Sequence, residues 1–164
     1  MTDTPDSLGA GLLLEDRLPL RWHALAVDAA EQQSLAVSNE ETLRVILSLD
    51  DHHSESMEES ELGPELLRIE MRLNLVLELV SQVLAQQLVL PRALPVTLSA
   101  RVARWKAAEP LTPGPGVLEL YVSTRYPRPL QFPAVLELLS GGVVQATFTG
   151  LGAGTQELLE RLIF

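Results

Sequence analysis

The most regular hydrophobic pattern in the chain lies between residues 64 and 88. Apolar residues recur there at steps of three and four, which keeps them on one face of a helix and matches the a and d positions of a heptad repeat over about three heptads. Pro64 suits the first turn of such a helix, and we expect the helix to end before Pro91. The residues at the a and d positions are Leu66, Ile69, Leu73, Val76, Val80 and Val83.

The residue types along this helix favour self-association. Leucine predominates at a and β-branched residues fill every d position, a combination that disfavours a parallel dimer and leans toward four helices. Apolar residues at the flanking e and g positions, Leu77, Leu79 and Leu84, widen the stripe beyond what two helices can bury. We therefore predict a homo-oligomer, with a tetramer as the favoured state.

Two alternatives to self-association stay open. A helix buried inside its own domain would show similar spacing, because three heptads is the minimum for predicting a coiled coil. Against this, the segment carries about a dozen large apolar side chains, each worth ~1.5–3 kcal/mol on burial, and a small domain covers one face of a helix. Binding to a membrane surface is less well supported, because the only bases on this helix are Arg68 and Arg72.

The rest of the chain shows mainly strand-like patterns. Residues 18–27 form one candidate strand, and four short runs rich in β-branched residues follow Pro91, separated by proline and glycine signals. Ser140-Gly141-Gly142 between two of these runs predicts a hairpin turn. Several short strands at this spacing are typical of a barrel or sandwich. The four runs after Pro91 are residues 95–106, 116–126, 130–139 and 142–149.

Two shorter helices are expected on either side of these elements. Asn39 is a candidate N-cap, with acidic residues in the first turn after it, and predicts a helix over about 39–50 that follows a polar connection. Thr155 is a candidate cap for a last helix over 156–163, whose leucines lie on one side.

Composition limits the classes of protein that remain. The length of 164 residues suits one domain, and the absence of cysteine excludes disulfides and thiolate metal sites. The net charge of −10 lies mostly around residues 50–63, which we expect to be an acidic linker or the exposed start of the next helix. Because the whole chain is negative and shows no basic patch, we expect no nucleic-acid partner. The acidic start does not resemble a secretory signal, and no apolar run reaches the ~20 residues that span a bilayer. We predict a cytoplasmic protein without membrane partners.

Catalytic and metal-binding patterns are weak throughout the sequence. We find no nucleophile elbow, phosphate loop or cysteine nucleophile, so the sequence predicts a protein that is not an enzyme. Adjacent His52 and His53 point to different sides of a helix or strand, so they do not easily share one metal ion. We therefore expect neither a metal nor a resident cofactor.

One short pattern offers binding chemistry. Arg17-Leu-Pro-Leu-Arg21 places two arginines four residues apart, and arginine's planar fork suits phosphates and stacks on bases. Among so many arginines, roughly 0.7 such pairs arise by chance, so the pattern alone is uninformative.

The order of these features resembles the PilZ family, and in particular its atypical, tetrameric members, in which a long heptad-bearing helix interrupts the barrel sequence. The local similarity lies in Val96–Trp105 and in Gly116–Val122. The resemblance implies an α+β fold: a six-stranded β-barrel with an inserted heptad helix and a C-terminal helix. Residues 1–16 would then be a flexible lead-in, and 17–164 one domain with a helical insertion over 39–90.

The resemblance also implies a ligand, cyclic di-GMP, and residues that bind it. Arg17 and Arg21 match the arginine pair that grips the ligand, and Ser99 matches the serine of the second motif, Asp/Asn-x-Ser-x-x-Gly. Thr97 stands where that motif has an acid or amide, and Val102 where it has glycine, which removes the close backbone approach that glycine permits. The nearby bases that could partly substitute are Arg101 and Arg104. We therefore interpret the ligand motif as degenerate.

The expected function is a signalling adaptor of the cyclic di-GMP type that is not an enzyme, assembles through residues 64–88 and contacts an unidentified protein partner. The alternative is a purely structural oligomeric interaction protein with no nucleotide site. The substitutions at Thr97 and Val102 favour that alternative.

Overall fold

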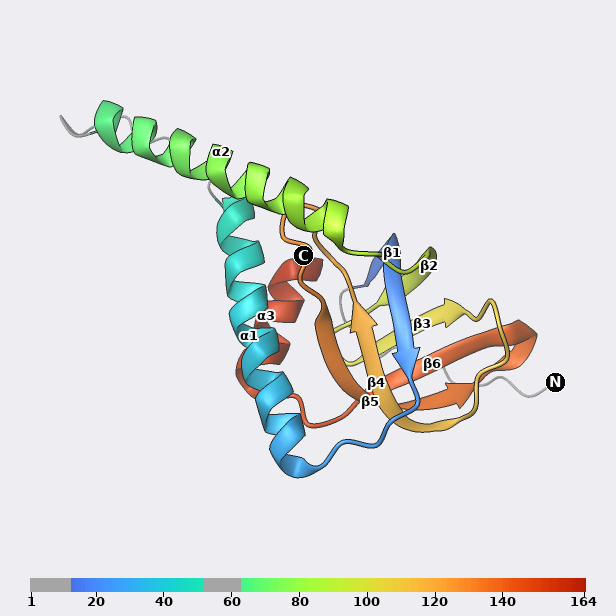
Figure 1. Cartoon of the computed structure of the whole chain (residues 1–164). Coiled ribbons are helices and arrows are strands. Elements are labelled where there is room, and N and C mark those ends of the chain that lie inside the picture. Colours follow the sequence, from blue (N-terminus) through green and yellow to red (C-terminus); the bar gives the residue numbers. More distant parts are fainter. Residues whose placement is uncertain (1–12, 52–62) are drawn as a thin grey trace.

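The computed structural model describes residues 13–51 and 63–164. In this part of the chain the first strand is followed by two helices, and the remaining strands then lead to a last helix (Figure 1). Their bounds are β1 Leu14–His23, α1 Ala29–Asp51, α2 Gly63–Gln87, β2 Ala93–Leu98, β3 Val102–Lys106, β4 Gly114–Leu120, β5 Leu130–Leu138, β6 Val143–Phe148 and α3 Ala153–Ile163.

The strands form a closed antiparallel barrel in the order β1-β2-β3-β6-β5-β4. Alternate side chains of each strand point inward, as a pleated strand requires. Leu18 and Leu20 of β1 are buried, and Leu20 lies opposite Leu120 of β4. The rings of Phe132 and Phe148 stack at 4.5 Å between centroids. The predicted α+β fold with a six-stranded barrel, an inserted long helix and a C-terminal helix is confirmed.

Several strand boundaries differ from the prediction. Residues 95–106, expected as one run, form β2 and β3 with a turn between them, because the Ser99 hydroxyl accepts the amides of Arg101 and Val102. β1 starts at Leu14 and ends at His23, so residues 14–16 belong to the barrel and not to the lead-in. The hairpin at Ser140–Gly142 is confirmed, with positive φ at Gly141 and Gly142.

The first helix begins ten residues before the predicted start at residue 39. Asp28 is its true N-cap: the Asp28 carboxylate accepts the Glu31 amide at 2.8 Å, and the Glu31 carboxylate accepts the Asp28 amide at 3.1 Å. This reciprocal pair is a capping box. Asn39 lies inside α1, so the prediction that it caps the helix was wrong. The helical insertion between β1 and β2 therefore begins at Ala29.

Two helices cover one side of the barrel. α1 packs against β5 and α3, and the three elements bury Leu43, Ile46 and Leu159 (Figure 1). The N-cap of α3 is Gly152, whereas Thr155, the predicted cap, is a buried residue within the helix. α1 therefore covers β5, and α3 packs on α1.

The helix α2 contacts this packed body through one of its sides. Figure 1 shows it crossing the end of α1 and extending beyond it, away from the barrel. Its bounds, Gly63–Gln87, agree with the predicted 64–88 to within one residue. The acidic linker predicted over 50–63 falls almost entirely on residues outside the described ranges. Within residues 13–51 and 63–164, no helix is both long enough and apolar enough to span a membrane.

Candidate functional site

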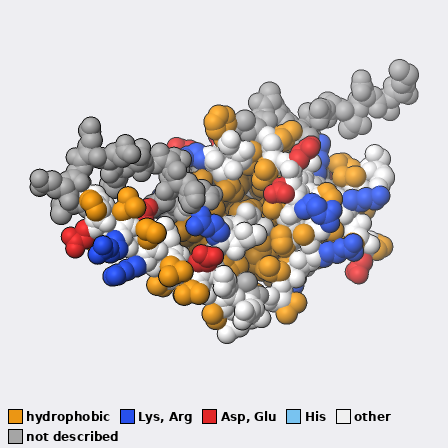
Figure 2. Space-filling model, turned by 90° about the horizontal axis from the view of Figure 1, so that it is seen from above, with side chains coloured by type: hydrophobic (Ala, Val, Ile, Leu, Met, Phe, Trp, Pro, Cys, Tyr) orange, Lys and Arg blue, Asp and Glu red, His pale blue; other side chains and the backbone are white. Residues whose placement is uncertain are grey.

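The heptad face of α2 is exposed along its whole length. The side chains at its a and d positions keep between 45% and 58% of their surface accessible. Figure 2, which looks down on this side of the molecule, shows hydrophobic side chains at the surface among a few charged ones. The prediction that one small barrel cannot enclose this helix is thus confirmed for the described chain. The exposed a and d residues are Leu66, Ile69, Leu73, Val76, Val80 and Val83.

A different side of α2 faces the body. Asn74, Leu77 and Ser81 are half-buried and line a cavity of about 340 Å³ that also touches the end of α1 and the loop after β4. The Ser81 hydroxyl donates a hydrogen bond to the backbone carbonyl of Arg125 in that loop. Leu77, expected to widen the apolar stripe, turns toward the body instead. Attachment through this side leaves the a and d positions free.

Two of the five main candidate ligand residues lie in one cavity on the outside of the barrel. Arg17 of β1 and Thr97 of β2 line a space of about 720 Å³. Arg17 donates to the Ala93 carbonyl at 3.3 Å. Arg104, expected only as a partial substitute, and Lys106 also line this cavity from β3. Lys106 was not predicted as a site residue, because the register between β2 and β3 that brings it there depends on the turn at Ser99.

The other three candidates lie elsewhere. Arg21 pairs in register with Glu119 of β4, on the far side of β1 from Thr97. Ser99 and Arg101 belong to the turn between β2 and β3, where the Ser99 hydroxyl accepts backbone amides. Val102, which stands where the family motif has glycine, is buried in the barrel wall. The structure therefore does not bring the five residues into a single site.

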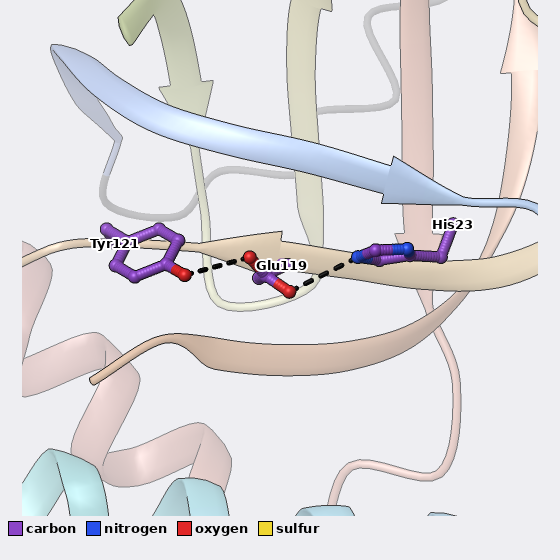
Figure 3. Close-up of polar contacts among 3 residues, drawn as sticks. All are labelled: His23, Glu119 and Tyr121. Atoms are coloured by element: carbon purple, nitrogen blue, oxygen red, sulfur yellow. Dashed lines mark hydrogen bonds and ion pairs between the residues drawn. The ribbon is translucent and has the colours of Figure 1, made fainter. Parts of the chain in front are cut away.

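A chain of polar contacts crosses the outer face of β4 (Figure 3). One carboxylate oxygen of Glu119 lies 3.2 Å from Nε2 of His23, and the other accepts a hydrogen bond from the Tyr121 hydroxyl at 2.9 Å. Burial raises the pKa of Tyr121, and the hydrogen bond to Glu119 and the negative charge of Glu119 raise it further, while Arg21 lowers it. No motif marks this cluster, since it depends on the pairing of β1 with β4.

The described residues do not form a candidate metal site. Among residues 13–51 and 63–164, no group of three or more histidines or acids is arranged to hold a metal ion. The pair His52 and His53 lies outside these ranges, so its candidate role stays untested.

Comparison with known proteins adds two findings. Residues 42–164 match the family model described as an atypical PilZ domain, cyclic di-GMP receptor. A solved structure, that of a pathogenic protein from Xanthomonas campestris, is similar over 96% of this chain and 88% of that one, with 29% identity and a TM-score of 0.80. That protein is described as a tetrameric PilZ domain that self-assembles through an unusual helical bundle. A search of curated proteins found no match.

Proposed function

The chain belongs to the atypical PilZ domain family, and from this premise we propose that it is a cytoplasmic signalling adaptor, not an enzyme, that assembles through α2 and carries a degenerate cyclic di-GMP motif. The observation that carries the proposal is the exposed heptad face of α2. A contiguous apolar stripe of this size is unfavourable in water and is typical of an interface.

The form of the assembly follows from the residues on this face. Leucine at a with β-branched residues at d favours four helices over two. The Xanthomonas campestris protein supports the same state, because it is described as a tetramer held by a helical bundle. The comparison covers 96% of this chain and so includes most of α2. We propose a homotetramer with the a and d residues at its centre.

Light scattering on the purified chain tests the assembly. Leu73 at position a and Leu75 at position c are equally exposed, 58% and 57%, but lie on different sides of α2. We expect Leu73→Glu to dissociate the tetramer, since it places a charge in the seam, and Leu75→Glu to leave it assembled. A monomeric unmodified chain, or equal effects of the two variants, contradicts the proposal.

The ligand motif supports weak or absent binding of cyclic di-GMP. Thr97 lacks the carboxylate or amide that the family motif offers, and the Val102 side chain fills the barrel wall. Arg17 borders the cavity beside β2, whereas Arg21 pairs in register with β4 and does not line that cavity. We propose that the barrel acts through a protein partner, with Arg17 and Thr97 retaining at most a partial anion site.

Calorimetric titration with cyclic di-GMP tests this second part independently of assembly. We expect no saturable heat from the unmodified chain or from Arg17→Ala. Micromolar binding that Arg17→Ala abolishes while Arg101→Ala leaves it intact would instead make the chain a direct receptor. The purely structural alternative is favoured if the tetramer forms, no cyclic dinucleotide binds and signalling in the cell does not depend on the chain.

A further inference from the structure

A separate cavity of about 750 Å³ lies on the outside of the barrel, between β4, the end of β1 and the first half of α1. Its floor includes Val117 and Glu119 of β4, and its walls include Leu35 of α1 and Leu25 of the connection after β1. The volume is in the range of small-molecule sites, which combine apolar walls with a few polar groups. None of the five predicted ligand residues lines it.

The polar group that dominates this cavity is a buried carboxylate. Glu119 is only 8% exposed. A carboxylate offers about four acceptor positions, and two of those of Glu119 face His23 and Tyr121. Two acceptor positions therefore remain for another donor.

The charge of Glu119 lacks a permanent partner in the described chain. His23 forms its ion pair, and a histidine is charged only when protonated. Arg21 lies opposite Glu119 in register but forms no ion pair with it within residues 13–51 and 63–164. Burying a carboxylate whose only ion-pair partner among the described residues is a titratable histidine is costly, so the site favours an added positive charge.

The other residues that line the cavity also favour a positively charged ligand. Among the described residues, no arginine or lysine borders the cavity, and a second carboxylate, Glu31, does. An anion would be repelled here, unlike in the cavity beside Arg17. The apolar walls of Leu25, Leu35 and Val117, with Trp22 at the edge, suit a flat hydrocarbon body attached to the charge.

We propose that this cavity binds a small organic cation, an ammonium, amidinium or guanidinium group on an aromatic or alkyl body, and that Glu119 holds the charged group. The charged group would bind the Glu119 carboxylate, and its hydrocarbon body would lie in this open cavity between β4 and α1. No residue of α2 lines this cavity, so binding of the cation can be tested independently of the tetramer.

Calorimetry with three probes of nearly equal shape tests the proposal on the full chain near neutral pH. Benzamidine carries a positive charge, benzamide none and benzoate a negative one. We expect saturable benzamidine binding at millimolar concentration, roughly 10-fold to 100-fold tighter than benzamide, as a charge-assisted hydrogen bond implies, and no binding of benzoate.

Matched variants assign the effect to one carboxylate. Glu119→Gln keeps the shape of the side chain and should weaken benzamidine binding at least tenfold. Glu137→Gln, at an exposed carboxylate of β5 outside the cavity, should bind benzamidine like the unmodified chain. A thermal melt reports whether each variant is folded.

A second variant covers the case in which Glu119→Gln does not fold. Ser34→Lys keeps Glu119 and brings an ammonium group of the chain itself to the cavity wall, so it should abolish benzamidine binding by competition. The proposal is overturned if benzamidine gives no heat, if the three probes bind equally, or if Ser34→Lys binds benzamidine as the unmodified chain does.

Discussion

The Asn39 side chain of α1 makes a two-way hydrogen bond with the backbone of Gln131 in β5. Its amide donates to the Gln131 carbonyl, and its side-chain oxygen accepts the Gln131 amide, both at 2.8 Å. Two residues further along β5, the Pro133 carbonyl accepts the Thr149 amide, next to where β6 pairs with the same edge. β6 pairs with β5 only over Ala134–Leu138. Asn39 therefore makes the hydrogen bonds to Gln131 that a neighbouring strand would otherwise make.

Replacing Asn39 should destabilise the fold substantially. Asn39 is 2% exposed and Gln131 is half-buried, so Asn39→Ala leaves a partly buried donor and a partly buried acceptor of Gln131 without partners. Each unsatisfied group costs about 1–3 kcal/mol, and we expect the free energy of unfolding to fall by about 2–4 kcal/mol in urea denaturation. Glu41→Ala, at an exposed position of the same helix, is the control and should change it by less than about 0.5 kcal/mol. Equal stability of the two variants would contradict the role assigned to Asn39.

Gly116 should tolerate no side chain. A Cβ there would lie 2.2 Å from a ring carbon of Trp22 and 2.4 Å from the backbone oxygen of His23. The His23 oxygen cannot move freely, because His23 pairs with Val117 in the barrel. We expect Gly116→Ala to lower the free energy of unfolding by about 3 kcal/mol, at the upper end of overpacking effects, in a chemical denaturation experiment.

A second glycine provides the comparison for that measurement. A Cβ on Gly154 in α3 would meet only the flexible end of Glu40, at 3.4 Å. Alanine favours a helix over glycine by about 1 kcal/mol, so Gly154→Ala should be neutral or up to about 1 kcal/mol more stable. If Gly116→Ala were equally harmless, the close packing of Trp22 on β4 would be wrong.

Tyr121 should make stability depend on pH in the alkaline range. Burial and then Glu119 raise its pKa above the ordinary 10.0, so above that pH the folded chain retains a proton that the unfolded chain loses. The stabilisation is complete below about pH 10 and is lost as pH rises through the folded pKa. Relative to Tyr121→Phe, the unmodified chain should therefore lose stability above pH 10 and keep a constant difference below it.

Absorbance of the phenolate provides the direct check. In a Tyr126→Phe background Tyr121 is the only tyrosine, and adding Glu119→Gln removes the neighbouring negative charge that helps to raise its pKa. We expect the Tyr121 titration to move to lower pH in that double variant. A titration curve that does not move would mean that Glu119 is not among the causes of the raised pKa.

The α2 helix should be stable only within the assembly. Its described attachment to the body is the side of Asn74, Leu77 and Ser81, so few buried contacts hold it in a single subunit. In the Leu73→Glu variant we expect hydrogen exchange of α2 amides to accelerate at least tenfold while β5 amides stay protected, since local opening follows local contacts. Leu75→Glu is the matched control. Equal protection of α2 in both variants would indicate that the body alone stabilises it.

Local patterns in the sequence were sufficient to predict those elements whose structure depends on neighbouring residues alone. The steps of three and four from Leu66 to Val83 predicted α2 and its apolar face, because helical spacing alone determines which residues share a face. The glycines at 141 and 142 predicted the hairpin between β5 and β6, because few other residues adopt a positive φ. The resemblance to the PilZ family then supplied the number of strands.

Pairing between distant segments was decided only by the tertiary structure. Asn39 looks like a helix cap in the sequence, but it binds Gln131, a residue 92 positions away, because β6 leaves part of the β5 edge uncovered. The arginine pair of β1 shows the same limit: Arg17 shares a cavity with Thr97, whereas Arg21 lies opposite Glu119. Strand register fixes such neighbours, and register depends on contacts that close the whole barrel and that no local window of sequence contains.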